Sequence, residues 1–344
     1  MPEVVALGDV NVDIIAHFPF YPAKGQDALA SSAEFHCGGS AANTAMALAW
    51  MGLEVSLISR VGPDPLATRV LDHLSVVGVL STSLQRDPSV ATGLMYVVVT
   101  PDGERTMLGH RGANVNTDPN QIREEAIRDA RLLHLSGYAL LADPQRSAAL
   151  LTMEIACRHD LIVTLDPGMS VPQAALDEIH ALLPVIDVLL PNLPEAQRLT
   201  GLTSPEECAE WLSASGVGLV ALKLGKDGCL VRSSRDILWV PGFSIEAHDT
   251  TGAGDFFAAG VIAGHLRGLD WHSTAILANA LGALAAAQVG AGASVPSAVE
   301  VLDLLHGQAQ ATDQQERSAA IRRASDFVAM LATKPEEEEK RWWK

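Results

Sequence analysis

Asp249-Thr250-Thr251-Gly252-Ala253-Gly254-Asp255 comes directly before an apolar stretch that is typical of a buried helix. We expect this helix to begin near Gly252, so that the segment lies at its N-terminus. The first amides of a helix have no partners inside it and carry the positive end of its dipole. Small residues there let an anion approach the backbone, and Asp255 adds a carboxylate in the first turn. The segment therefore predicts a phosphate site beside a proton acceptor, with an ordinary glycine-rich turn as the alternative.

The composition is that of a globular protein with an acidic balance of charge. The chain has 344 residues, of which 48% are hydrophobic, and a formal net charge of −17. This length allows one large α/β domain or two smaller ones. The negative charge argues against nucleic acid and anionic membranes as partners, because both attract basic surfaces.

The cysteines and the apolar runs indicate a cytoplasmic enzyme. Four scattered cysteines without a C-x-x-C pair favour reduced thiols over disulfides or a zinc site. The N-terminus shows no basic segment followed by an apolar run, so we expect no secretion signal. Residues 275–293 are rich in Ala and Gly but include polar side chains, which favours a buried helix over a membrane span.

Short apolar runs alternate with helical patterns along the chain. The expected strands are residues 3–9, 54–59, 131–136, 161–165, 186–190 and 217–222. The expected helices are residues 40–51, 64–77, 144–158, 174–183, 194–214 and 252–288. Strands without polar alternation, separated by helices, are typical of a parallel sheet covered on both faces. The sequence predicts an α/β fold, a three-layer αβα sandwich with a mainly parallel central sheet.

Two stretches, residues 12–37 and 82–112, interrupt this alternation with β-type sequence. We expect them to pair into a small antiparallel β-sheet that serves as a lid. The main domain then covers residues 1–310, and residues 311–344 form a helical and charged C-terminal extension.

A second glycine motif, Gly38-Gly39-Ser40-Ala41-Ala42-Asn43, precedes another helical stretch. With both motifs in this order, the chain resembles the ribokinase-like sugar kinases, the phosphofructokinase B (PfkB) family, over residues 3–305. The resemblance implies ATP-dependent phosphorylation of a hydroxyl of a small sugar or sugar-like acceptor, with Mg²⁺. By the same resemblance, Asp255 deprotonates the acceptor hydroxyl. The amides of Gly252, Ala253 and Gly254 then form an anion hole for the transferred phosphoryl group.

The resemblance also implies which residues bind the acceptor. They are Asn11, Asp13, Gly38, Gly39, Asn43 and, on the lid, Arg105. The alternatives are an Asx turn for Asn11 and Asp13, a tight turn for the glycines and a solvated side chain for Arg105.

The identity of the acceptor stays open between two classes. Ribokinase has Lys where this chain has Ser40, and Glu where it reads Ser136-Gly137-Tyr138, which argues against ribose. A nucleoside is the second hypothesis, because four aromatic residues cluster in the lid segment: Phe18, Phe20, Tyr21 and Phe35.

Further residues are assigned by the resemblance to the nucleotide and the metal ions. Those for ATP are Asn192, Glu195, Lys223, Gly225, Gly228 and Asn279, with Glu195 also ordering Mg²⁺ through water. Those for a monovalent cation, K⁺, are Asp249, Thr251, Gly290 and Ser294. A helix capping box is the alternative for Asn192 and Glu195, and capping of a neighbour is the alternative for Asn279.

Other function classes lack their motifs in this sequence. A dinucleotide-dependent dehydrogenase needs G-x-G-x-x-G after the first strand, and a P-loop kinase needs G-x-x-x-x-G-K-[ST]. A non-catalytic sugar or nucleotide sensor is less favoured, because Asp255 and the glycines are all present. Since lid strands have edges that can pair, we expect a homodimer through the lid.

Overall fold

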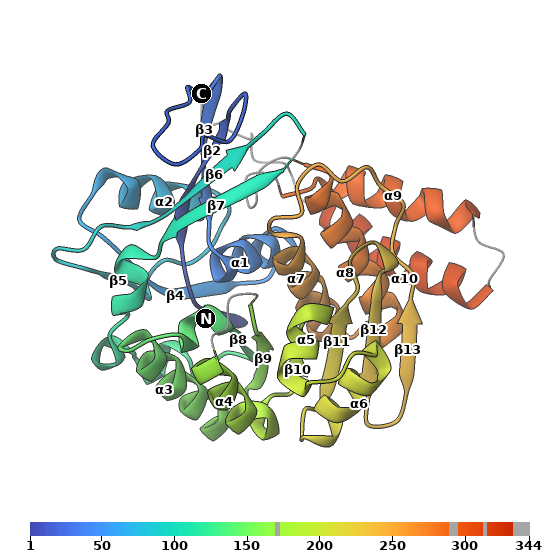
Figure 1. Ribbon diagram of the computed structural model, residues 1–344. Helices are drawn as coiled ribbons and strands as arrows, with labels where there is room; N and C mark the ends of the chain where they lie inside the picture. Colours follow the sequence, from blue (N-terminus) through green and yellow to red (C-terminus); the bar gives the residue numbers. More distant parts are fainter. Residues whose placement is uncertain (103, 169–172, 289–294, 312–314, 333–344) are drawn as a thin grey trace.

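The computed structural model describes residues 1–344 except 103, 169–172, 289–294, 312–314 and 333–344 (Figure 1). The strands are β1 (Val4–Leu7), β2 (Asn11–His17), β3 (Ser32–Gly38), β4 (Val55–Val61), β5 (Leu84–Arg86), β6 (Gly93–Val99), β7 (Arg105–His110), β8 (Leu132–Ser136), β9 (Ile162–Asp166), β10 (Val188–Leu189), β11 (Leu219–Lys223), β12 (Cys229–Ser233) and β13 (Ile237–Val240). The α-helices are α1 (Ser40–Trp50), α2 (Pro65–Val76), α3 (Gln145–Arg158), α4 (Gln173–Leu182), α5 (Leu193–Thr200), α6 (Pro205–Ala214), α7 (Ala253–Leu266), α8 (Trp271–Ala286), α9 (Ala298–Ala311) and α10 (Gln315–Ala332).

The larger sheet has the strand order β13-β12-β11-β10-β9-β8-β1-β4-β5 within the described residues. It is parallel from β11 to β5, while β12 and β13 are antiparallel additions at one edge. Alternate residues of β1 enter opposite cores: Val4 and Ala6 pack with α1, α2 and α7–α10, whereas Val5 and Leu7 pack with α3–α6. The predicted three-layer α/β sandwich is therefore confirmed (Figure 1).

Two of the expected helices are in fact pairs of helices. Residues 194–214 divide into α5 and α6, because Gly201 has a φ of 72° and Ser204 caps the following helix through the amide of Glu207. Residues 252–288 divide into α7 and α8, because Gly268 has a φ of 77° and Asp270 caps the amide of Ser273. A glycine that ends one helix and a polar cap that starts the next explain both breaks.

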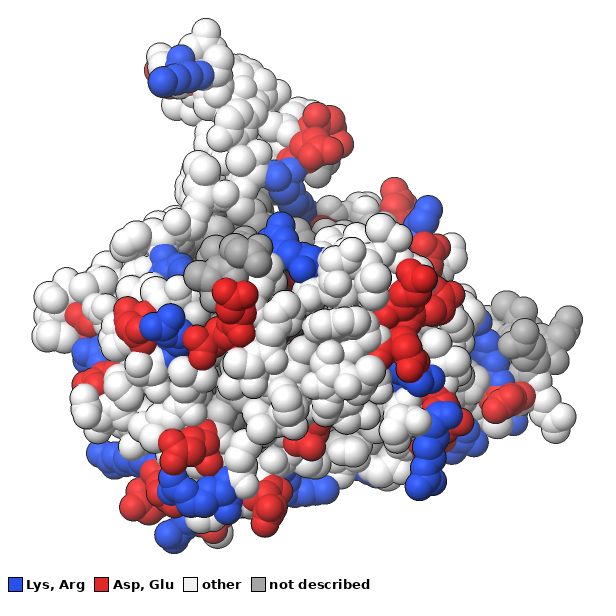
Figure 2. All heavy atoms as spheres, turned by 60° about the horizontal axis from the view of Figure 1, so that its bottom comes forward, with Lys and Arg blue, Asp and Glu red and all other residues white. Residues whose placement is uncertain are grey.

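The four lid strands form a separate sheet of order β3-β2-β6-β7 within the described residues. Its central pair, β2 and β6, is parallel, so the expectation of an antiparallel sheet is wrong at this pair. Strand β5, inside the expected lid range 82–112, pairs instead with β4 at the edge of the main sheet. The lid sheet projects from the body of the molecule (Figure 1, Figure 2).

The C-terminal helices belong to one helical layer. Helix α10 packs on α8 and α9 through buried side chains that include Ile321, Phe327 and Val328. Arg323 adds an ion pair to Asp270 at the start of α8, with 2.6 Å between Nε and Oδ2. Helix α10 lies within residues 311–344, where a helical extension was expected. Helix α9 and strands β12 and β13 were not expected.

Charge is evenly mixed on the face shown in Figure 2, where acidic and basic side chains lie interspersed. Among the described residues, no helix is both long and apolar enough to cross a membrane.

Candidate active site

Helix α7 begins at the turn that the sequence analysis selected. Gly252 is its N-cap residue with a φ of 78°, a conformation that a side chain would strain, and no side chain of the described residues caps this helix end. The amide of Ala253 donates to the carbonyl of Thr250, so it is partly engaged within the turn. The remaining first-turn amides and the helix dipole make this end of α7 suitable for an anion.

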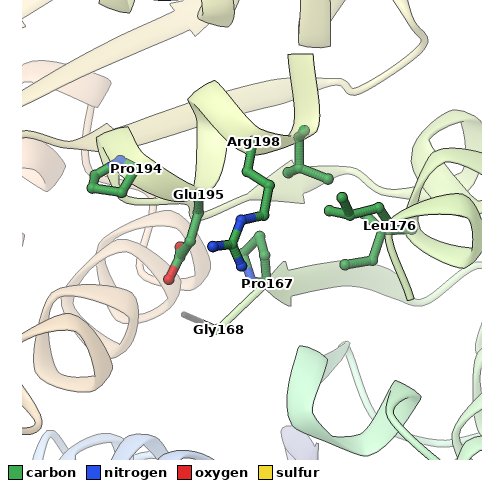
Figure 3. Close-up of a pocket in the computed structure, with 8 residues that line it drawn as sticks. Pro167, Gly168, Leu176, Pro194, Glu195 and Arg198 are labelled. Carbon is green, nitrogen blue, oxygen red and sulfur yellow. The ribbon is translucent and has the colours of Figure 1, made fainter. Parts of the chain in front are cut away.

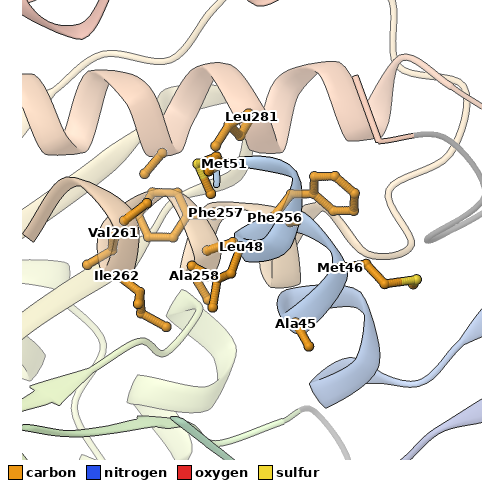
Figure 4. Packing of buried hydrophobic residues seen from close by; sticks show 14 of the residues in the cluster. Ala45, Met46, Leu48, Met51, Phe256, Phe257, Ala258, Val261, Ile262 and Leu281 are labelled. Atoms are coloured by element: carbon orange, nitrogen blue, oxygen red, sulfur yellow. The ribbon is translucent and has the colours of Figure 1, made fainter. Parts of the chain in front are cut away.

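A close apolar contact fixes the start of α7. Figure 4 shows Phe256 and Phe257 of α7 in one buried cluster with Leu48 of α1, Met51 just after α1 and Leu281 of α8. Phe256 is 1% exposed and Met51 is also 1% exposed. Because this packing is rigid, the first turn of α7 has a fixed place relative to the N-terminus of α1.

Asp255 in this first turn meets the first glycine motif. Its Oδ1 accepts a hydrogen bond from the Ser40 hydroxyl, and its Oδ2 accepts one from Asn43 Nδ2, both at 2.8 Å. Burial, and then the nearby Asp166 carboxylate, raise the pKa of Asp255 to about 6, although Asn43, Ser40 and Lys223 act in the opposite direction. A carboxylate with a pKa near neutrality is suited to accept a proton.

Asp13 in β2 lies beside Asp255. Burial, and then the charge of Asp255, raise the pKa of Asp13 to about 7. Gly38 and Gly39 pass close to this carboxylate and to the end of β1: a Cβ at Gly38 would lie 2.1 Å from Asp13 Oδ2, and one at Gly39 would lie 2.4 Å from the Asp9 carbonyl. The structure therefore brings Asp13, both glycines, Asn43 and Asp255 together.

Asn11 is held at the start of β2 by a network that sequence reasoning did not find. Its Oδ1 accepts from Asn114 Nδ2 at 2.9 Å. Next to it, the guanidinium of Arg111 binds both oxygens of Asp9, and Gln145 Nε2 donates to Asp9 Oδ1. A polar residue just past the end of β1, such as Asp9, is the sequence signal for this network.

A pocket of about 360 Å³ lies on the other side of the α7 N-terminus. It is lined by residues that include Asn192, Lys223, Gly225, Gly228, Gly254 and Asn279. Asn279 Nδ2 donates to the carbonyl of Val240 at 3.1 Å, so the capping alternative holds for this side chain as well. The volume is within the range of small-molecule sites, and the lining includes Thr250, Ala253 and Gly254 at the start of α7.

Asn192 and Glu195 form the capping box that was the alternative for them. Asn192 Oδ1 accepts from the Glu195 amide at 2.9 Å, and Glu195 Oε2 accepts from the Asn192 amide at 2.8 Å. Burial, and then Asp166, raise the pKa of Glu195 to about 7, against the effect of Lys223. Figure 3 shows Glu195 and Arg198 of α5 beside Pro167 and Gly168, around a small cavity of about 120 Å³.

Lys223, at the end of β11, extends toward Glu195 and Asp166. Its Nζ lies 2.6 Å from Asp166 Oδ2, at the end of β9. Sequence reasoning selected Lys223 for the nucleotide but missed Asp166, although an acidic residue at the carboxyl end of a parallel strand is a recognisable signal.

Arg105, expected to bind the acceptor, has partners on the turn before α7. Its guanidinium forms an ion pair with Asp249, and its Nη2 donates to the carbonyl of His248 at 2.8 Å. Asp249 Oδ1 also accepts from the amide of Thr251 at 2.8 Å. The two other residues expected at the monovalent cation, Gly290 and Ser294, lie outside the described residues.

The carboxylates near the start of α7 fit a divalent ion that keeps its water shell better than one that they bind directly. No group of three His, Cys, Asp or Glu side chains in the described part of the chain is arranged to hold a metal ion. The carboxylates of Asp166, Glu195 and Asp255 nevertheless influence one another electrostatically. Mg²⁺ keeps several waters in most protein sites, so these carboxylates suit contacts through water.

This fold and this site define a class of protein, the ATP-dependent kinases that act on a hydroxyl. A helix N-terminus without a side-chain cap in the described residues, a partly buried carboxylate beside it and a pocket of about 360 Å³ lie at one edge of a parallel sheet. The chain belongs to the pfkB family of carbohydrate kinases, whose family model matches residues 1–298. It is therefore an ATP-dependent sugar kinase of that family, which uses ATP and Mg²⁺.

Known relatives cover nearly the whole chain. An ATP-dependent ribose-1-phosphate kinase of Halopiger xanaduensis is 33% identical over 89% of this chain and 98% of that protein. A ribokinase of Haemophilus influenzae is 26% identical over 88% of this chain and 98% of that protein. A solved structure from E. coli with ATP and Mg²⁺ has a TM-score of 0.82 and 23% identity, covers 89% of this chain and 100% of that chain, and supports the fold.

Proposed function

We propose that this enzyme transfers the γ-phosphoryl group of ATP to a hydroxyl of a pentose-like sugar or sugar phosphate, with Asp255 as the base. The observation that carries the proposal is the placement of Asp255, which lies in the first turn of α7 and is hydrogen-bonded by Ser40 and Asn43. The proton of the acceptor hydroxyl passes to Asp255 as the new O–P bond forms and the bond to the departing ADP breaks. Asn11, Asp13 and Asn43 bind the other acceptor hydroxyls.

The amides around Gly252–Gly254 receive the negative charge of the phosphoryl group in this proposal. These amides belong to a helix end with no side-chain cap in the described residues. They therefore need little rearrangement to bind the charged phosphoryl group. The nucleotide occupies the 360 Å³ pocket, along Gly225, Gly228 and Asn279. Asn192 and Glu195 hold the water shell of Mg²⁺, which neutralises phosphate charge.

We also propose that a positive charge beside Asp249 and Thr251 supports the turn before α7. Potassium is the cation that the sequence predicts, with Gly290 and Ser294 as further ligands. Because Arg105 is paired with Asp249, potassium has to compete with a guanidinium for this carboxylate. Turnover measured with K⁺ and with tetramethylammonium tests potassium activation: a rate that is equal in both salts would contradict it.

The acceptor is tested by ADP release with Mg·ATP and four acceptors: D-ribose, ribose 1-phosphate, D-fructose and adenosine. The first two follow from the relatives, and adenosine tests the nucleoside alternative. We expect turnover with ribose 1-phosphate to exceed turnover with adenosine. ATP binding without turnover on any acceptor would contradict the proposed activity.

We further propose a cytoplasmic homodimer that forms through the lid. All four cysteines are unpaired, as expected for a reducing compartment. Lid strand β7 is an edge strand that exposes Met107 at 44% and Leu108 at 54%. Light scattering should give twice the chain mass for the wild type and the single mass for Leu108→Asp, while Val299→Asp, at a 59% exposed position on α9 outside the lid, stays dimeric. A monomeric wild type would contradict this assembly.

A further inference from the structure

Lys223 carries a charge in a place where a charge is costly. Its side chain is 12% exposed, and that of its partner Asp166 is 9% exposed. An ion pair removed from water repays little of its desolvation cost, so such a pair is weak grounds for a purely stabilising role. Its position therefore calls for a functional explanation.

The ammonium group lies at the anion hole and not at the outer part of the nucleotide pocket. A Cβ built on Gly254 would be 3.3 Å from Lys223 Nζ. Lys223 and Gly254 line the same pocket. A phosphoryl group bound at the first turn of α7 would thus lie within reach of both the backbone amides and this ammonium group.

We propose that Lys223 is a catalytic residue that donates a hydrogen bond to a non-bridging oxygen of the phosphoryl group in transit, and that Asp166 is the positioning residue that aims it. The proposal rests on the proposed function. Lys223 keeps its proton throughout, because the acceptor proton goes to Asp255 and the electron pair of the broken bond leaves with ADP. The fixed cation offsets charge that develops on the phosphoryl oxygens.

The surroundings keep Lys223 protonated. Burial alone would lower the pKa of its ammonium group, but the carboxylates of Asp166, Glu195 and Asp255 outweigh burial and raise it. The other titratable neighbour is His134 of β8, whose pKa burial lowers to about 4, so it is neutral at pH 7.

The test compares Lys223→Met with the wild type and with Lys24→Met, a change at an exposed lysine. Two quantities are measured: kcat with the best of the four acceptors, and the Kd of Mg·ADP by calorimetry. We expect Lys223→Met to lower kcat by about 10²- to 10³-fold, as loss of an oxyanion donor does, with little change in the Kd. A kcat within a few fold of the wild type, or an equal loss of kcat and ADP affinity, would overturn the proposal.

Two further variants separate catalysis from folding. Lys223→Met with Asp166→Asn removes both charges of the buried ion pair, and we expect it to fold and to show the same loss of kcat. Asp166→Asn alone should lower kcat with little change in the Kd of Mg·ADP, because Lys223 Nζ loses the carboxylate that aims it; an unchanged kcat would remove Asp166 from the account. An inactive wild type would end the proposed function and this inference together, whereas an active Lys223→Met variant would end the inference alone.

Discussion

Asp255 has a pKa that reflects a balance between opposing neighbours. Burial and Asp166 favour its neutral form, whereas the hydrogen bonds from Asn43 and Ser40 favour the carboxylate. The result, a pKa of about 6, leaves the group ionised at pH 7 but close enough to neutrality to take a proton. Asp13, with a pKa of about 7, titrates beside it, so the two groups share their titration.

This balance predicts the pH dependence of Ser40→Ala. The base must be deprotonated, so kcat/KM of the wild type should fall as pH decreases through 7 and 6, the pKa values of Asp13 and Asp255. Because the Ser40 hydroxyl lowers the pKa of Asp255, its removal should raise that pKa and move the acidic limb to higher pH. The control is Ser31→Ala, at an exposed serine. A limb that stays in place or moves to lower pH would contradict the role of Ser40.

At the residue scale, the sequence predicted the residues that motifs specify. Gly38, Gly39, Asn43 and Asp255 come from two glycine motifs, and the structure places them together. The contacts of Lys223 with Asp166 and of Arg105 with Asp249 were beyond prediction. They join segments far apart in sequence through single long side chains, and no local pattern records such a pairing.

Helix α7 depends on its contact with α1 and α8 for its position. Phe256 is 1% exposed in this contact. Replacing it with Ala leaves a cavity, and we expect the free energy of unfolding to fall by about 3–5 kcal/mol. Urea denaturation measures this value, with Leu29→Ala as the control because Leu29 is 88% exposed. Equal stabilities of the two variants would show that this contact does not anchor α7.

The lid strand β7 is tied to the turn before α7 by one ion pair. The side chains of Arg105 and Asp249 are 12% and 2% exposed, so Arg105→Gln leaves a buried carboxylate without its countercharge. We expect this change to destabilise the protein by about 3–5 kcal/mol. The double variant Arg105→Gln, Asp249→Asn should recover part of that loss. Additive effects in thermal or urea unfolding would argue that the two residues are independent.

At the element scale, the errors have a common cause. Strands of the parallel sheet were found because their residues are buried on both faces. The breaks between α5 and α6 and between α7 and α8 were missed because apolar spacing continues across them. Gly201 and Gly268, each followed by a polar cap, were the local signals that periodicity masked.

At the scale of the whole molecule, the residues of the candidate active site come from both sheets. The carboxyl ends of β9 and β11 bring Asp166 and Lys223 to the α7 N-terminus, while the lid sheet brings Asp13 from the other side. The overall α/β architecture could be predicted from alternating patterns. The combination of parallel and antiparallel strand pairs in the lid, and the packing of α10 on α8, could not be predicted. Strand partners and the faces on which helices pack are set by tertiary contacts.

The most direct test of the central claim is ³¹P NMR of the reaction with Mg·ATP and the best acceptor, for the wild type and Asp255→Asn. The account predicts a sugar phosphate ester and ADP in equal amounts from the wild type. It predicts a rate about 10²- to 10⁴-fold lower for the variant, whose amide cannot take the acceptor proton. A variant that forms the ester at the wild-type rate would contradict Asp255 as the base, and formation of free phosphate without an ester would contradict sugar phosphorylation itself.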